Sequence, residues 1–331
     1  MKKFKMGLLA LVSFVFSSIS FSQAPTASGN VMNFSAVASY EPYTEDESTW
    51  ASLRTIAELS SSLLTLAEQE ANSGNESDTL YPDFLKEVLN TDNIFQIGNY
   101  LIKIDLVNER GLVIASSNDN AYSNLVNNNL TATGMMVLDG DEDFGLELLE
   151  ALANNTTTPA EYQSFLNANR PCPGAAKRKD AANAEQWFQT NEQCDIGGTY
   201  TIGRTYGMDN LLRYRKSIFY FSLQSKIRSV WRCTFGGIWV GAPIYYIVDL
   251  NLVGTVKYRR RCETEVNKSI NFEEGYFGGG NGTLSWNPYG AGRSLSHYDF
   301  NVDFGIRPAQ DRNPNPPPYT PSRHYRIYWG Y

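Results

Sequence analysis

The two histidines are the first residues to weigh for chemistry, because histidine is the side chain that most often transfers protons near neutral pH. His297 lies on a polar strand face that also carries Asp299. This pair is the candidate catalytic site of a glycan-acting hydrolase, to which an acidic loop could add carboxylates. The sequence contains neither the serine motif GxSxG nor the zinc motif HExxH. A hydrolase is therefore the second hypothesis rather than the first.

The acidic loop offers a metal site. Asp139, Asp141, Asp143 and Glu150 fall at positions one, three, five and twelve of a calcium-loop pattern, where a hard cation takes oxygen ligands. Phe144 occupies position six, which calcium loops reserve for a glycine. The same acids would also stabilise the positive end of a helix that begins near Asp143. Calcium is the one cofactor that the sequence suggests, and both interpretations stay open.

Aromatic and basic residues of the second half could form a binding surface. The candidate ligand-binding aromatic residues lie in or just after a glycine-rich segment: Tyr276, Phe277, Trp286 and Tyr289. Aromatic faces stack on sugar rings or bases, and the run Arg259, Arg260 and Arg261 could attract anions such as acidic polysaccharide. The alternative is that these rings belong to a core and that the arginines lie on a solvated strand edge.

The beginning of the chain has the features of an export signal. Basic residues at 2–5 precede an apolar run at 7–16, and Ser20 and Ser22 provide the small residues of a cleavage site. The sequence therefore predicts a signal peptide at 1–22 and a periplasmic or extracellular protein. No later segment is apolar enough for a transmembrane helix, so the mature chain is expected to be soluble or surface-associated.

Charge divides the remainder into two parts. Residues 24–170 contain 22 acidic and 5 basic residues, whereas 171–331 contain 13 acidic and 20 basic residues. The basic part could dock on the acidic part. The predicted organisation is an extended lead at 23–43, an acidic α+β region at 44–167, a linker at 168–195 and a β-rich basic domain at 196–331.

All the cysteines lie in the second part, at Cys172, Cys194, Cys233 and Cys262. An even number of cysteines in an exported chain favours two disulfides, for which three pairings are possible. Pairing of nearest neighbours along the chain is the preferred prediction. Zinc is the rival, but no CxxC spacing is present and the histidines are distant in sequence.

Hydrophobic periodicity predicts the fold class. Apolar residues recur every three or four positions over 44–67, which indicates an amphipathic helix, and 94–115 is typical of a hairpin. Strict alternation of apolar and polar residues follows at 219–233, 244–262 and 298–306. The prediction is an α+β chain, with a small helical and hairpin N-terminal region followed by an antiparallel β sandwich or small barrel.

The segment YPDFLKEVLNTDNIFQIGNYLIKID, residues 81–105, has a leucine-rich helix, an Asn-Asp turn and an Ile-Gly-Asn-Tyr strand. It resembles uncharacterised secreted proteins of Bacteroidota, and the Ser-Phe-Ser-Gln end of the signal is similar to theirs as well. The resemblance implies export but no activity, and it covers no candidate site residue.

These observations favour an exported, non-enzymatic binding or cell-envelope interaction protein. Its expected partner is an acidic polysaccharide or another protein, and nucleic acid is not expected because no binding motif accompanies the basic charge. A secreted glycan-acting hydrolase is the alternative. A further alternative is an outer-membrane β-barrel protein, because aromatic residues alternate up to the carboxyl-terminal Tyr331.

Overall fold

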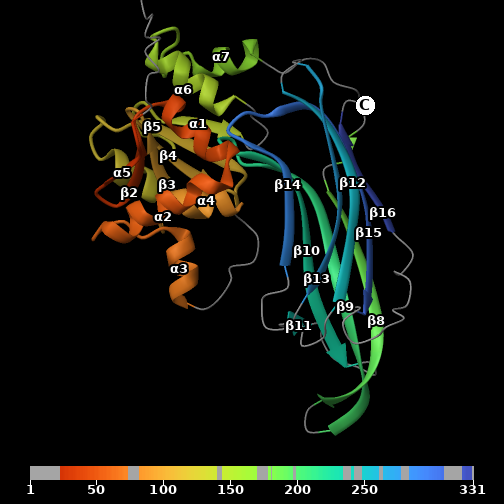
Figure 1. Cartoon of the computed structure of the whole chain (residues 1–331). Helices are drawn as coiled ribbons and strands as arrows, with labels where there is room; N and C mark the ends of the chain where they lie inside the picture. The colour runs from red at the N-terminus through yellow and green to blue at the C-terminus, as the bar shows by residue number, and fades with distance from the viewer. Residues whose placement is uncertain are drawn as a thin grey trace, which may run out of the picture.

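The computed structural model describes residues 23–73, 82–139, 144–169, 178–179, 181–196, 199–233, 240–241, 248–260, 264–276, 283–308 and 323–329. They form an α+β protein in which a helix-rich N-terminal region lies beside two long, curved sheets (Figure 1). The predicted fold class is confirmed. In the ranges that the structure covers, no helix has the length and apolar character needed to cross a membrane.

The N-terminal region is built on a six-stranded sheet. Its strands follow the chain order: β1 (Thr26–Ser28), β2 (Val31–Phe34), β3 (Ile94–Ile97), β4 (Tyr100–Asp105), β5 (Arg110–Ala115) and β6 (Met136–Asp139). Neighbours are antiparallel except for the parallel pair β2 and β3. Because side chains alternate along a strand, Ile102 and Ile104 enter the main core while Leu101 enters a smaller core on the opposite face.

Helices cover both faces of this sheet. The main core includes side chains from most of them: α1 (Val37–Glu45), α2 (Trp50–Leu59), α3 (Leu66–Ser73), α4 (Asp83–Val88), α6 (Gly145–Ala153) and α7 (Tyr162–Ala168). A short 3₁₀ helix, η1 (Glu47–Thr49), joins α1 to α2. On the opposite face, α5 (Ala121–Val126) packs through Leu125 into the smaller core.

The long helix predicted over 44–67 is divided in the structure. The segment 23–43, expected to be an extended lead, contains β1, β2 and most of α1. One break separates α1 from α2, which η1 joins. A second break separates α2 from α3, where Thr65 and Glu68 form a reciprocal cap. The Thr65 amide donates to the Glu68 carboxylate at 2.8 Å, and the Glu68 amide donates to Thr65 Oγ1 at 3.3 Å. This pairing starts a new helix at Leu66, although the apolar stripe of the sequence continues across it.

Two sheets form the second part as a sandwich. One has the order β11 (Val240–Gly241), β10 (Phe221–Cys233), β9 (Thr199–Lys216), β8 (Ala181–Ile196), with β14 (Thr283–Ala291) also on β10. The other has the order β13 (Val266–Tyr276), β12 (Val248–Arg260), β15 (Leu295–Pro308), β16 (Arg323–Trp329), β7 (Arg178–Lys179). The range 168–195, expected to be a linker, thus contains β7 and most of β8.

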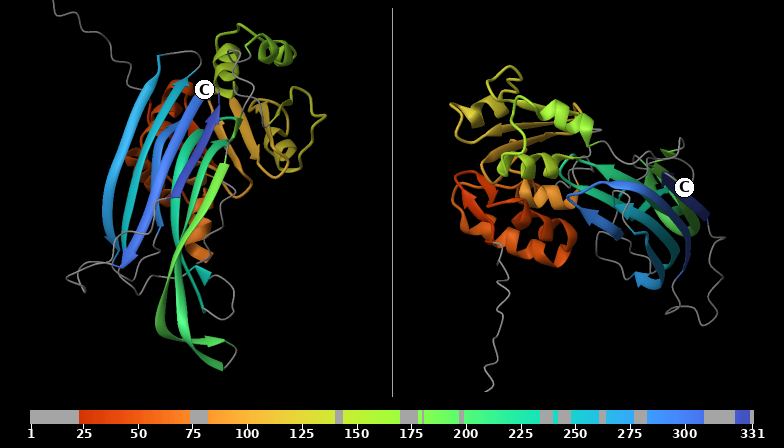
Figure 2. Two further views of the ribbon diagram at one scale, coloured as in Figure 1. Left: turned by 90° about the vertical axis from the view of Figure 1, so that its right-hand side faces the viewer. Right: turned by 90° about the horizontal axis from the view of Figure 1, so that it is seen from above.

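The sandwich core contains side chains from both sheets. Leu212 and Leu223 contribute from the first, and Val256 and Phe300 from the second. Burial follows the predicted alternation on β12 and β15, where Leu252, Val256 and Tyr258, and likewise the even positions 298 to 304, are buried. Views from the side and from above show the two sheets layered against each other, with the N-terminal region at one end (Figure 2).

The turn between β9 and β10 inserts into the N-terminal core. Ile218, Phe219 and Tyr220 belong to that core and not to the sandwich core. The Tyr40 hydroxyl donates to the Phe219 carbonyl at 2.9 Å, and the Tyr220 ring lies 4.9 Å from the Phe84 ring. Ile218 has φ of 63°, an outlier for a β-branched residue, so the surrounding packing must compensate for the strain. Phe219 and Tyr220 were expected on the strand itself.

Two glycines allow the second part to approach α6 closely. A Cβ atom on Gly145 would lie 2.7 Å from the Phe219 ring and 2.8 Å from the Ile218 carbonyl oxygen. A Cβ atom on Gly292 would overlap the Leu146 side chain. All of these separations are below van der Waals contact, so only glycine fits at these positions without movement of the neighbours.

Charged residues join the two parts beside this contact. Arg293, in the turn from β14 to β15, binds Glu41 of α1 at 2.5 Å, and Glu147 and Glu150 of α6 at 2.9 and 2.7 Å. The three carboxylates raise the pKa of the Arg293 guanidinium, although burial alone would lower it. The Arg293 side chain is only 19% exposed. This cluster therefore fixes the basic part on the acidic one.

The first prediction concerns the close approach at α6. Gly145→Ala should lower the free energy of unfolding by about 1–3 kcal/mol, because the added methyl group overpacks Phe219. Chemical denaturation measures the change. Ala51→Ser, at an exposed position of α2, is the control and should change stability by less than about 0.5 kcal/mol. Stabilisation by Gly145→Ala, as helix propensity alone predicts, would contradict the close packing.

The second prediction concerns the arginine cluster. Arg293→Met should lower the free energy of unfolding by about 3 kcal/mol, because it removes the cation from three carboxylates, of which Glu147 is buried and Glu41 partly buried. Arg326→Met is the comparison, because Arg326 binds Asp299 on the outer face of the sandwich and is 45% exposed. It should lower the free energy of unfolding by less than about 1 kcal/mol. Equal losses in urea unfolding of the two variants would show that the cluster has no special role.

Candidate functional site

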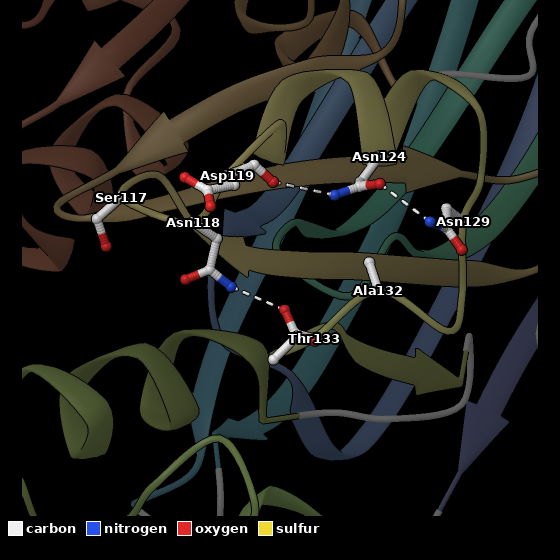
Figure 3. A pocket seen from close by; sticks show the side chains of 7 residues that line it. All are labelled: Ser117, Asn118, Asp119, Asn124, Asn129, Ala132 and Thr133. Atoms are coloured by element: carbon white, nitrogen blue, oxygen red, sulfur yellow. Dashed lines mark hydrogen bonds between the residues drawn. The ribbon is translucent and has the colours of Figure 1, made fainter.

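A polar bowl lies on the N-terminal six-stranded sheet, on the face that carries the smaller core. The chain leaves β5 at Ala115, forms α5 and returns at β6, and the two ends of this loop line a cavity of about 550 Å³. Figure 3 shows the lining residues: Ser117, Asn118, Asp119, Asn124, Asn129, Ala132 and Thr133. We call this cavity the asparagine bowl. Its volume is within the range of small-ligand pockets.

Hydrogen bonds between side chains and the backbone shape the asparagine bowl. Asn118 donates to the Thr133 carbonyl at 2.8 Å, which ties the two ends of the loop together. Asn124 donates to the Asp119 carbonyl at 3.3 Å and accepts from Asn129 at 3.0 Å. The described part of the lining is therefore a set of neutral donors and acceptors with one carboxylate, that of Asp119.

Buried polar residues hold the loop on the sheet. The Tyr122 hydroxyl of α5 donates to Asp92 at 2.6 Å and accepts from Asn90 at 3.0 Å. Lys103, buried on β4, donates to the carbonyls of Leu125 and Val126 at 3.0 and 3.2 Å, and so caps the end of α5. Desolvation lowers the pKa of Lys103. The bowl thus rests on a rigid support, which reduces the entropy lost when a ligand binds.

A second cavity, of about 640 Å³, lies between α1, the turn from β3 to β4, and the end of α6. Its walls contain both apolar and polar residues. The apolar residues include Val37, Ile97 and Leu152, and the polar residues include Asn99 and Asn154. Tyr100 is one of the lining residues and is half-buried, and burial raises the pKa of its phenol. We call this cavity the mixed groove.

The candidate catalytic residues lie on the outer face of the sandwich. Both carboxylate oxygens of Asp299 bind Arg326, at 2.7 Å each. His297 Nδ1 lies 3.1 Å from the Ser296 hydroxyl, and the exposed His324 lies 3.3 Å from Asp303. Asp299 is thus held by an arginine and forms no described hydrogen bond with His297. The described cavities do not include either residue of the pair.

The candidate aromatic residues do not gather on one described surface. Tyr289 is 4% exposed and belongs to the sandwich core. Trp286 is partly buried against Phe300, with ring centroids 5.2 Å apart. Tyr276 ends β13, and Phe277 lies outside the described residues. Both described rings, Trp286 and Tyr289, therefore contribute to packing.

The candidate basic residues are used within the chain. Arg259 binds Glu265 at 3.5 Å, and Arg260 binds Glu45 of α1 at 2.6 Å. Arg260 also lies over the Tyr289 ring, 5.8 Å from its centroid. Arg261 lies outside the described residues. Together with Arg293, the Arg260 contact supports the idea that the basic part docks on the acidic part.

The candidate calcium ligands are only partly described. Asp139 ends β6 and is exposed, Glu150 binds Arg293, and Asp141 and Asp143 fall outside the described residues. Within the described ranges, no three His, Cys, Asp or Glu side chains are grouped to hold a metal.

Of the cysteines, Cys194 and Cys233 lie in β8 and β10, and Cys172 and Cys262 lie outside the described residues.

The asparagine bowl was not among the sites predicted from sequence. Its signal is compositional: six asparagines occur between residues 118 and 129. This density predicts a turn-rich loop, because asparagine adopts left-handed backbone angles and hydrogen-bonds to nearby backbone groups. Asn120 and Asn128 do adopt positive φ, of 56° and 52°. Sequence alone does not show that the loop closes on itself through the bond from Asn118 to Thr133.

Comparison with known proteins provides no relative for this architecture. No family model matches the chain, and no curated protein or solved structure matches it significantly. The geometry of the sites therefore carries the functional interpretation.

The third prediction concerns the support of the asparagine bowl. Burial and the bond to Asp92 raise the pKa of Tyr122 from 10 to about 12. The folded state keeps this proton above the pH at which the unfolded chain loses it, so the stabilisation is complete below pH 10 and is lost as the pH rises towards 12. Tyr122→Phe should lower the free energy of unfolding by about 1 kcal/mol at pH 8, and this difference should shrink between pH 10 and 12.

Urea unfolding at a series of pH values measures this difference. Tyr162→Phe, which removes a hydroxyl from a half-buried tyrosine of α7, is the matched control for loss of one hydroxyl. A difference between wild type and Tyr122→Phe that stays constant or grows above pH 10 would contradict the assignment.

Proposed function

We propose that this chain is an exported, non-enzymatic binding protein whose asparagine bowl binds a neutral carbohydrate. The observation that carries the proposal is the lining of the bowl, where amide and hydroxyl groups surround an open cavity of about 550 Å³ on a rigid support. The signal-like sequence at 1–22 supports export. A carbohydrate of the cell envelope fits this setting.

The chemistry of the bowl suits hydroxyl groups. An amide side chain offers two donors and an acceptor, so it pairs with a hydroxyl that both donates and accepts. Ser117 and Thr133 add groups of the same kind, and Asp119 adds a strong acceptor. None of the described residues that line the bowl is basic, so Asp119 would repel an acidic sugar. The ligand chemistry is therefore that of a neutral, hydroxyl-rich molecule.

The charges of the second part support the same proposal. Acidic polysaccharide was the ligand expected from Arg259 to Arg261, but Arg259 binds Glu265 and Arg260 binds Glu45. Arg293 is similarly surrounded by Glu41, Glu147 and Glu150. These described arginines hold the chain together, which leaves the bowl as the better supported ligand site. In this proposal the sandwich supports the N-terminal region, which contains the bowl.

The fourth prediction tests the bowl directly. A glycan array with labelled protein should show binding to neutral glycans that changes little between low and high salt, because few charges take part. Asn129→Ala should weaken that binding by at least about tenfold, equal to about 1.4 kcal/mol. Titration calorimetry on the array hit measures the change.

Asn127→Ala is the matched control. Asn127 is an exposed asparagine of the same loop that bonds to Ser123 and does not line the bowl. It should leave glycan affinity unchanged. Equal effects of the two variants, or binding restricted to anionic glycans and abolished by salt, would refute the proposal.

A further inference from the structure

The asparagine bowl and the mixed groove meet at one hydrogen-bonded pair. The Ser116 amide donates to the Asn99 carbonyl at 2.7 Å. Asn99 lines the mixed groove, and Ser117, the next residue after Ser116, lines the bowl. Tyr100 of the groove is paired across the sheet with Ala115, whose carbonyl accepts the amide of Asn118 at 3.0 Å. The walls of the two cavities are therefore adjacent at the ends of β4 and β5.

We propose that the two cavities are subsites of one extended site, which binds a linear neutral oligosaccharide along the rim formed by Asn99 and Ser116. This inference rests on the proposed function and specifies its ligand as a chain of several sugar rings. A single ring would fill only the bowl. A chain that continues past Ser116 would reach the mixed groove on the other side of the rim.

The walls of the mixed groove suit sugar rings. A pyranose ring has an apolar C–H face and a hydroxyl edge, so it needs apolar and polar contacts together. The groove is lined by exposed Ala38 and Ala153 and by exposed Asn154 and Asn155, together with Tyr100. Pockets that combine an apolar surface with a few placed polar groups are typical of small-molecule sites.

The groove, like the bowl, suits a neutral ligand. Among the described residues that line it, Glu150 is the one acidic side chain, and Arg293 binds that carboxylate at 2.7 Å. The groove therefore presents little net charge, and a neutral chain can lie in both subsites. The turn from β3 to β4 is held in place, because the Gly98 amide donates to the Phe34 carbonyl at 2.7 Å. Both walls of the rim are thus fixed by backbone bonds.

The test measures affinity against chain length. The probes are cello-, xylo-, manno- and chito-oligosaccharide ladders, each from the monosaccharide to the hexasaccharide, titrated into the full-length mature protein by calorimetry. In at least one ladder, affinity should rise at least about tenfold between the shortest and the longest chains, because the second subsite adds its contacts without a second loss of translational freedom.

Ala38→Trp places a bulky ring in the groove at an exposed position and leaves the bowl intact. It should remove the gain with chain length and leave the affinity of the shortest bound sugar unchanged. Ala51→Trp, at an exposed position of α2 that lines neither cavity, is the matched control and should keep the gain. Thermal unfolding of both variants verifies that each is folded.

The outcomes separate the two proposals. Short sugars that bind through Asn129, with no gain from length and no effect of Ala38→Trp, would overturn the extended site and leave the proposed function standing. Failure of every ladder to bind at any length would overturn both. A gain with length that Ala38→Trp removes and Ala51→Trp retains is the result expected for two subsites.

Discussion

The insertion of the β9–β10 turn into the N-terminal core is the contact on which the rest of the structure depends. Ile218, Phe219 and Tyr220 complete a core whose other buried members lie more than fifty residues earlier, between Met32 and Leu166 in the chain. Gly145 leaves space for this turn. Arg293, in the neighbouring turn from β14 to β15, binds three carboxylates of α1 and α6. Both halves therefore contribute side chains to the N-terminal core, and their opposite charges form ion pairs at the contact between them.

The asparagine bowl depends on this arrangement only indirectly, because a separate set of polar contacts supports it. The loop that contains Asn118 and Asn124 is irregular, yet its side chains bond to backbone groups, and Tyr122 and Lys103 anchor α5 to the sheet. Polar groups that are already satisfied in this way keep their geometry when a ligand arrives. A loop of this kind can present a fixed pattern of donors without regular secondary structure.

Sequence patterns predicted the fold class well where one physical signal dominated. Alternation on β12 and β15 identified the buried faces, because a two-residue period has one structural meaning. The helix over 44–67 was predicted too long, since the cap formed by Thr65 and Glu68 competes with an apolar stripe that continues across it. The roles of Phe219 and Arg260 could not be read from sequence, because both depend on residues about 180 or more positions away.

The turn from Ser217 to Tyr220 has a consequence for the order in which the chain can fold. Synthesis proceeds from the amino terminus, so more than two hundred residues emerge before Phe219 can reach its place in the first core. Until then the surfaces beside Gly111 and Gly145 stay open, and the N-terminal region lacks its final packing partners. A chain that is exported, as proposed, would benefit from this delay, because a core that cannot close early leaves the polypeptide loose enough to be threaded across a membrane.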